Sequence, residues 1–195
     1  MKMRIKKSNL LFLGIVIFSI CFFALLILHQ SPKLPKYLEP ISERTAICYN
    51  RWICVLLNDS WHRPAYDTGI DLDIAKHFPS RNESEIRELI FESDQIVFLF
   101  EENGSAVEVA RAAPASYYIA YLSKRLYNRD INITGKVFLD PNFNGTVIKI
   151  FHPSPSFKEG IFLEGNTIEV KSRDYEGLRK AIGKLILIVA GYNDK

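Results

Sequence analysis

Histidine and aspartate side chains that could bind a cation gather in the segment 58–78, which lacks the periodicity of a long helix or strand. The candidates are His62, Asp67, Asp71, Asp73 and His77. Carboxylates at alternate positions, as at Asp71 and Asp73, could bind a hard cation through their oxygens. The spacing matches neither a calcium-binding loop nor a zinc motif, and acidic loops before helices are usually solvated. We therefore predict no metal site and no cofactor here.

A second polar group follows an apolar run of strand length at residues 95–101. It consists of Glu101, Glu102, Asn103 and Ser105. In a parallel α/β sheet, ligands bind at the carboxyl ends of the strands, beside the free amides of the next helix. These four side chains could therefore face a ligand, and the two glutamates favour a sugar or a cation over a phosphate. The alternative is a capped helix with solvated acids, because Ser105 and Glu108 have the spacing of a capping box.

Motifs for nucleophilic catalysis and nucleotide binding are absent from the sequence beyond residue 40. It contains no Gly-x-Ser-x-Gly, His-Glu-x-x-His or Ser-x-x-Lys pattern, no Gly-x-Gly-x-x-Gly and no Walker lysine. Among the four histidines, only His152, in Phe151-His152-Pro153, follows a predicted strand end. Because a lone histidine at a turn is usually just exposed, we predict no catalytic residue.

Aromatic residues make up 12% of the chain, and several tyrosines fall on one predicted helix. They are Tyr117, Tyr118, Tyr121 and Tyr127, with Arg125 and Arg129 nearby. Tyrosine and arginine are frequent anchors of protein interfaces. We expect at least two of these rings to pack on the sheet, and an exposed remainder would support a partner surface.

The segment Leu10–Leu28 contains 17 apolar residues out of 19 and no charge. As a helix it would be about 28 Å long, close to the hydrocarbon thickness of a bilayer. A cleaved secretory signal is the alternative, although its apolar region is usually shorter and ends in small residues. Four basic residues and no acid precede the segment. This charge pattern favours a cytoplasmic N-terminus and a C-terminal domain outside the membrane.

These features divide the chain into four parts. We predict a basic cytoplasmic stub at 1–9, a transmembrane helix at 10–28, a proline-rich tether at 29–40 and an extracytoplasmic domain at 41–195. The lipid bilayer is then the partner of residues 10–28. Beyond residue 30 the chain carries 21 basic and 22 acidic side chains. This balance excludes a nucleic-acid partner bound through a basic domain surface.

Five of the eleven asparagines lie in Asn-x-Ser/Thr sequons, as expected for an extracytoplasmic glycoprotein. The candidate glycosylation sites are Asn58, Asn82, Asn103, Asn132 and Asn144. Turn formation is the alternative role of these asparagines. A hairpin turning over residues 50–52 would place Cys48 and Cys54 opposite each other, and outside the cell such a pair is expected to form a disulfide. Two buried small hydrophobes are the alternative.

The domain sequence alternates helices and strands. Helices are expected from a capping box at Ser80 and Glu83 to Glu92, onward from Ser105 to about Tyr127 with a kink or break at Pro114, and from Asp174 to just before Gly191. Strands are expected at 95–101, 133–139, 146–151, 161–164 and 167–171, the last two joined by a turn at Gly165-Asn166. The fold class is α/β: an N-terminal transmembrane helix, then one small α/β domain with a mixed sheet and a C-terminal helix packed on it.

The layout of the full chain resembles the small single-pass envelope proteins of hyperthermophilic archaea. The shared features are the basic start at 2–7, one anchor, several sequons, and a closing hairpin before the helix that begins Asp174-Tyr175-Glu176-Gly177. A total of only two glutamines fits the avoidance of thermolabile residues in such proteins. The resemblance implies a membrane-anchored protein of unassigned role and brings no catalytic residue with it.

We therefore expect a non-enzymatic, membrane-tethered ectodomain that binds another envelope component. A carbohydrate-recognition module at the cell surface is the alternative, because acids follow the apolar strand and aromatic residues are abundant. A membrane-bound hydrolase is a third hypothesis, which would need His152 or His77 to lie with two carboxylates in one pocket.

Overall fold

The computed structural model of the chain describes residues 38–49, 51–102 and 106–192. The chain divides into two compact units at residues 36 and 37, and all described residues belong to the second unit. The predicted stub, the predicted transmembrane helix at 10–28 and most of the predicted tether lie outside the described residues. Within the described ranges, no helix has the length and apolar character needed to cross a membrane.

The first sheet is an antiparallel meander of four short strands in chain order. They are β1 (Leu38–Pro40), β2 (Thr45–Cys48), β3 (Trp52–Leu57) and β4 (Ser60–His62). No pattern in the sequence separates this sheet from the other strands. β1 falls at the end of the predicted tether and β4 in the segment 58–78 without clear periodicity, because strands of three residues are too short to show alternation and Pro40 argues against a strand. A proline is nevertheless compatible with an edge strand, which is the position of β1.

The second sheet is mixed, as the sequence predicts. Its strands are β5 (Gln95–Phe100), β6 (Asn132–Lys136), β7 (Thr146–Ile150), β8 (Gly160–Glu164) and β9 (Thr167–Lys171), in the spatial order β6-β5-β7-β9-β8. β8 is antiparallel to β9 and the other neighbours are parallel. The β8–β9 hairpin turns at Gly165, whose φ of 57° lies in the left-handed region. The mixed α/β class and the hairpin are thus confirmed.

Four helices complete the described unit. They are α2 (Leu72–Ala75), α3 (Glu83–Glu92), α4 (Ala106–Tyr127) and α5 (Tyr175–Ala190). The expected caps of α5 are confirmed: Gly177 N–H donates to Asp174 Oδ1 at 2.6 Å, and Gly191 ends the helix with φ 101°. The predicted N-cap of α3 is wrong, because the cap is Asn82 and Ser80 donates to the Glu83 side chain instead. α4 runs through Pro114 without a break.

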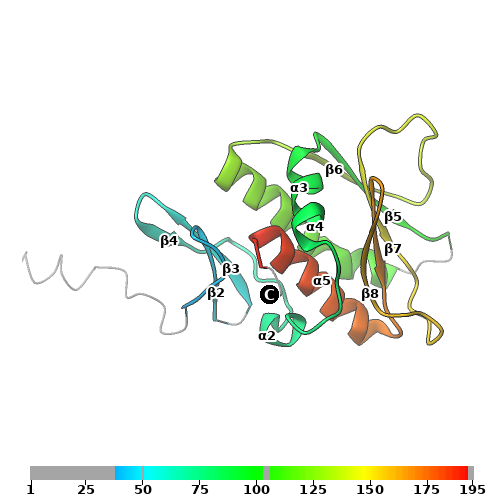
Figure 1. Cartoon of the computed structure of the whole chain (residues 1–195), viewed down its shortest axis with the longest axis horizontal. Coiled ribbons are helices and arrows are strands. Elements are labelled where there is room, and N and C mark those ends of the chain that lie inside the picture. The colour runs from blue at the N-terminus through cyan, green and yellow to red at the C-terminus, as the bar shows by residue number, and fades with distance from the viewer. Residues whose placement is uncertain (1–37, 50, 103–105, 193–195) are drawn as a thin grey trace, which may run out of the picture. The chain divides into compact units, whose positions relative to one another are not determined.

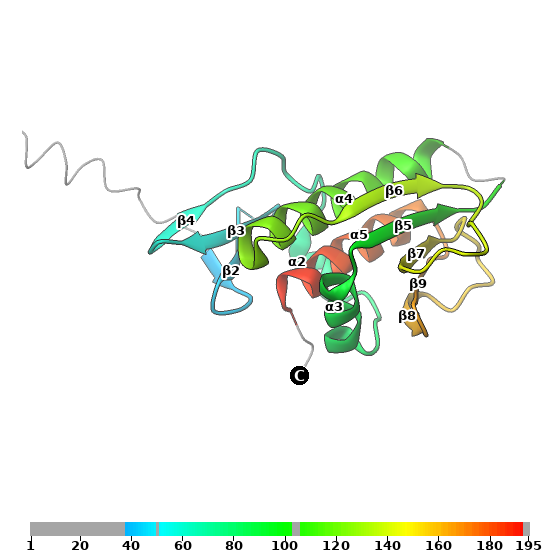
Figure 2. The same cartoon turned by 90° about the horizontal axis from the view of Figure 1, so that it is seen from above.

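The core lies between the mixed sheet and its helices, with α5 at its centre. Twelve of the 16 residues of α5 are buried, and it contacts α2, α3 and α4 as well as β8 and β9. Figures 1 and 2 show α3, α4 and α5 on one side of the mixed sheet. Alternate residues of β5, at Ile96, Phe98 and Phe100, join this core. No described helix covers the opposite face of the sheet, which is called the helix-free face below.

The tyrosines of α4 divide between core and surface. Tyr118 is fully buried, and its hydroxyl donates to the Tyr66 carbonyl at 3.1 Å. Burial raises the pKa of the Tyr118 phenol, because the charged phenolate loses its hydration. Tyr117 and Tyr121 stack at 6.0 Å and are partly buried against the core, whereas Tyr127 is 45% exposed. Three of the four tyrosines of α4 therefore pack in or against the core, and only Tyr127 is available on the predicted partner surface.

Candidate functional site

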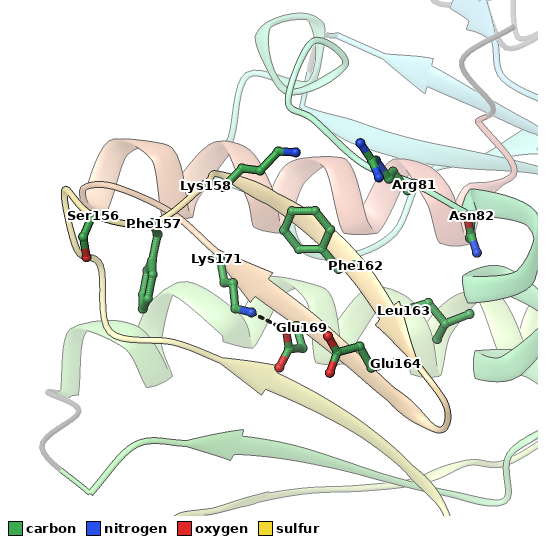
Figure 3. A pocket seen from close by; sticks show the side chains of 10 residues that line it. All are labelled: Arg81, Asn82, Ser156, Phe157, Lys158, Phe162, Leu163, Glu164, Glu169 and Lys171. Carbon is green, nitrogen blue, oxygen red and sulfur yellow. Dashed lines mark hydrogen bonds and ion pairs between the residues drawn. The ribbon is translucent and has the colours of Figure 1, made fainter.

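A cavity of about 560 Å³ opens beside the β8–β9 hairpin (Figure 3). Its lining is Arg81, Asn82, Ser156, Phe157, Lys158, Phe162, Leu163, Glu164, Glu169 and Lys171. Phe162 pairs with Glu169 across the hairpin, and both alternate with core residues, so both side chains point to the helix-free face. We call this the hairpin cavity. Its volume is within the range of about 300–1,000 Å³ that is usual for small-molecule sites.

Local backbone contacts hold the walls of the hairpin cavity in place. Ile161 donates its N–H to the Pro79 carbonyl at 3.0 Å and accepts from the Arg81 N–H at 3.2 Å, which fixes the segment before α3 against β8. Gly160 leaves room for the Phe162 ring, because a Cβ at that glycine would lie 2.6 Å from the ring's Cζ. The Phe157 wall is fixed as well, since Arg173 Nε donates to the Phe157 carbonyl at 3.3 Å. The cavity is therefore built from fixed segments.

Charge is distributed unevenly around the Phe162 ring. Arg81 and Lys158 lie on one side of the ring in Figure 3, and Lys171 with the two glutamates lies on the other. Lys171 forms an ion pair with the nearly buried Glu169, so these two charges offset each other. Glu164 is exposed. Within the described ranges, neither Arg81 nor Lys158 forms an ion pair. Their two charges are therefore available to a ligand.

A second group of functional side chains lies at the carboxyl ends of β5 and β7. Glu108, only 1% exposed, accepts hydrogen bonds from His152 Nδ1 at 2.6 Å and from the Tyr175 hydroxyl at 3.2 Å. The Glu101 carboxylate accepts the backbone N–H of His152 at 3.0 Å. We call these four residues the strand-end cluster. In a neutral His152 that donates its Nδ1 proton to an ionised Glu108, Nε2 is a lone-pair acceptor on a side chain that is 47% exposed.

The topology explains why these residues meet. β5 and β7 are parallel neighbours, and the chain leaves β5 through α4 to reach β6 on one side. It leaves β7 toward the β8–β9 hairpin on the other side. Such a change of direction between neighbouring strands is where α/β sheets usually hold their ligands. The predicted location at the strand ends therefore coincides with a topological switch point.

The structure brings together only part of the predicted ligand-facing set. Glu101 belongs to the strand-end cluster, Glu102 is exposed, and Asn103 and Ser105 lie outside the described residues. The predicted capping box cannot be followed at Ser105, which lies outside the described residues, and Glu108 is the buried partner of His152. A signal that could have found it is the position of His152 directly after the expected strand 146–151, because the observed parallel pairing of β5 with β7 places both carboxyl ends at one edge. No sequence signal pointed to Tyr175.

The aspartates and histidines between residues 62 and 77 take separate local roles. Asp71 caps α2, Asp67 accepts the Gly69 N–H at 2.9 Å, and Asp73 pairs with Lys76 at 2.7 Å. His62 lies in β4, and His77 follows α2. In the portion of the chain that the structure describes, no three His, Cys, Asp or Glu residues could hold a metal ion together.

Four of the five sequon asparagines are described, and all four are exposed: Asn58, Asn82, Asn132 and Asn144. Asn103 lies outside the described residues. The Sγ atoms of Cys48 and Cys54 lie at disulfide-bonding distance, with the Cα atoms 6.1 Å apart. The two cysteines are diagonal neighbours, not directly opposite as predicted, because Cys48 pairs with Trp52 and Cys54 with Ala46. The last strand pair before the turn is therefore Cys48 with Trp52, one position earlier than expected.

Comparison of the chain with protein-family models, curated proteins and solved structures finds no match.

Proposed function

We propose that this chain is a membrane-anchored protein whose extracytoplasmic domain binds another envelope component. The anchor and the outward orientation rest on the apolar segment 10–28 and the basic residues before it. The binding function rests on the hairpin cavity, where an aromatic ring on the helix-free face lies beside two cations that form no ion pair among the described residues. Aromatic and arginine side chains at such a cavity are typical of binding surfaces.

The test of this proposal is co-purification of the full chain from detergent-solubilised membranes. We expect a partner, identified by protein mass and sugar analysis, at fixed stoichiometry with the wild-type chain. Phe162→Ala should lose the partner, because truncating a central aromatic anchor of an interface costs about 2 kcal/mol or more. Tyr66→Ala, which removes an exposed ring elsewhere, should retain it. Repeated recovery of the wild-type chain alone would contradict the binding function.

The strand-end cluster supports a second candidate function, a membrane-bound hydrolase. A carboxylate on Nδ1 orients an imidazole so that Nε2 can act as a general base. In an ester hydrolysis, Nε2 would take a proton from water, the hydroxide oxygen would bond to the carbonyl carbon, and the C–O bond to the alcohol would break. The proton would then pass from Nε2 to the leaving alkoxide, giving an acid and an alcohol.

For this second function, the full chain in detergent should hydrolyse an activated ester such as p-nitrophenyl acetate. His152→Asn should lower the rate by about 10²–10⁴-fold, the usual contribution of a positioned general base. His62→Asn is the matched control, because His62 is also exposed but lies outside the strand-end cluster. If wild type and His152→Asn hydrolyse the ester equally, the hydrolase function is excluded.

A further inference from the structure

The hairpin cavity has two chemically different sides about one aromatic ring. Phe162 lies over Gly160, and Figure 3 shows its ring between two cationic side chains and two carboxylates. An aromatic ring is a surface on which the apolar face of a sugar can stack. The carboxylates of Glu164 and Glu169 are acceptors only, so they suit hydroxyl groups, which donate hydrogen bonds.

The cationic side of the cavity, at Arg81 and Lys158, favours a ligand that also carries one acidic group. Arg81 and Lys158 are exposed and form no ion pair among the described residues, so a ligand carboxylate could accept charge-assisted hydrogen bonds from both. Lys171 does not add to the positive charge available to a ligand, because its charge is already offset by the ion pair with Glu169. The lining therefore carries a net charge of one positive unit: Arg81, Lys158 and Lys171 against Glu164 and Glu169.

Taken together, this charge pattern fits a ring with hydroxyls on one side and a carboxylate on the other. We propose that the hairpin cavity binds a uronic-acid-type saccharide, with Phe162 stacking on the sugar and Arg81 and Lys158 binding its carboxylate. This inference rests on the proposed binding function and names its ligand class. The two carboxylates, Glu164 and Glu169, bind the hydroxyl groups.

Two other ligand classes fit the hairpin cavity less well. A phosphate-rich polyanion has no ring that could stack on Phe162, and the charge concentrated on each phosphate would be repelled by Glu164, whose carboxylate faces the cavity without an ion-pair partner among the described residues. An extended peptide that adds a strand to β8 would need the free backbone groups of its outer edge. At Ile161 this edge is already occupied by hydrogen bonds to Pro79 and Arg81.

The test is titration of the full chain in detergent with trigalacturonate, measured by calorimetry. The background is Ser84→Ala, which removes the sequon of Asn82 at the cavity rim and leaves the Asn82 side chain intact. We expect Arg81→Gln/Lys158→Gln to weaken binding about tenfold or more, because two charge-assisted hydrogen bonds are lost. Phe162→Ala should weaken it by a similar factor, and Lys124→Gln, an exposed cation outside the cavity, should not.

Two further ligands decide what is being recognised. Maltotriose, a neutral trisaccharide, should bind about tenfold more weakly than trigalacturonate, since it lacks the carboxylates. Triglutamate should also bind weakly, because it has the charge but no sugar ring. Equal binding of triglutamate, or no binding of trigalacturonate, would overturn the saccharide assignment. If one of these two results is obtained and a partner still co-purifies in a Phe162-dependent manner, only the saccharide assignment fails, and the proposed binding function stands.

Discussion

Replacing Glu83 with glutamine should lower the free energy of unfolding by about 3–5 kcal/mol, the usual cost of removing one charged member of a buried ion pair. Lys184 is fully buried in α5, and its Nζ lies 2.9 Å from Glu83 Oε1. The same Nζ donates to the Lys76 carbonyl at 3.0 Å and lies 4.7 Å from the centroid of the Tyr192 ring. The Lys76 carbonyl and the Tyr192 ring are neutral, so neither of them replaces the negative charge of Glu83 in the variant.

The measurement is urea unfolding of the full chain in detergent, with fluorescence as the probe and a check that the m-value is unchanged. Glu85→Gln is the matched control, because Glu85 also lies in the first turn of α3 but is exposed. It should change stability by less than about 1 kcal/mol, the size of a helix-dipole interaction. Glu83→Gln/Lys184→Met should recover much of the loss, since it removes both buried charges.

A loss in Glu83→Gln that is no larger than the loss in Glu85→Gln would show that Lys184 does not depend on Glu83. A double variant that is no more stable than Glu83→Gln would show that the buried charge is not the cause of the loss.

Elements with a strong periodic pattern and clear end signals were predicted from the sequence. α5 combines a broad apolar stripe with Asp174 and Gly191 at its ends, and both ends are as expected. The β8–β9 hairpin follows from two short apolar runs around Gly165. The pairing of the four short strands of the meander could not be predicted from such local patterns. The partners of its short strands are set by tertiary contacts, such as the 2.5 Å hydrogen bond from Thr45 to the Ala190 carbonyl.

The candidate site was less accessible to sequence reasoning, for two physical reasons. The hairpin cavity joins segments far apart in the chain, namely Arg81 before α3, Lys158 after β7 and Phe162 in β8. Their proximity depends on the strand order β7-β9-β8, which no local pattern encodes. In the strand-end cluster, the sequence indicated that Glu101 would follow a buried strand, as it does. It did not indicate that Glu108 would be buried, because a glutamate in a first helical turn is usually solvated.

Removing the Cys48–Cys54 pair should cost about 2–3 kcal/mol of stability, because a covalent link between residues six apart restricts the unfolded chain. The variant is Cys48→Ala/Cys54→Ala, measured by the same unfolding experiment without reductant. Both cysteines are buried, so alanine keeps a small apolar group at each position. Cys21→Ala is the control, since Cys21 lies in the predicted anchor and should leave the unfolding of the second unit unchanged.

The state of the same pair in cells bears on the orientation of the chain, because disulfides persist mainly outside the reducing cytosol. We expect Cys48 and Cys54 to resist thiol alkylation in denatured whole-cell extracts unless a reductant is added first. Alkylation without reductant would mean that the two thiols are free. If added protease also spared residues 41–195 in intact cells, the domain would face the cytoplasm, and an envelope partner for the hairpin cavity would lose its basis.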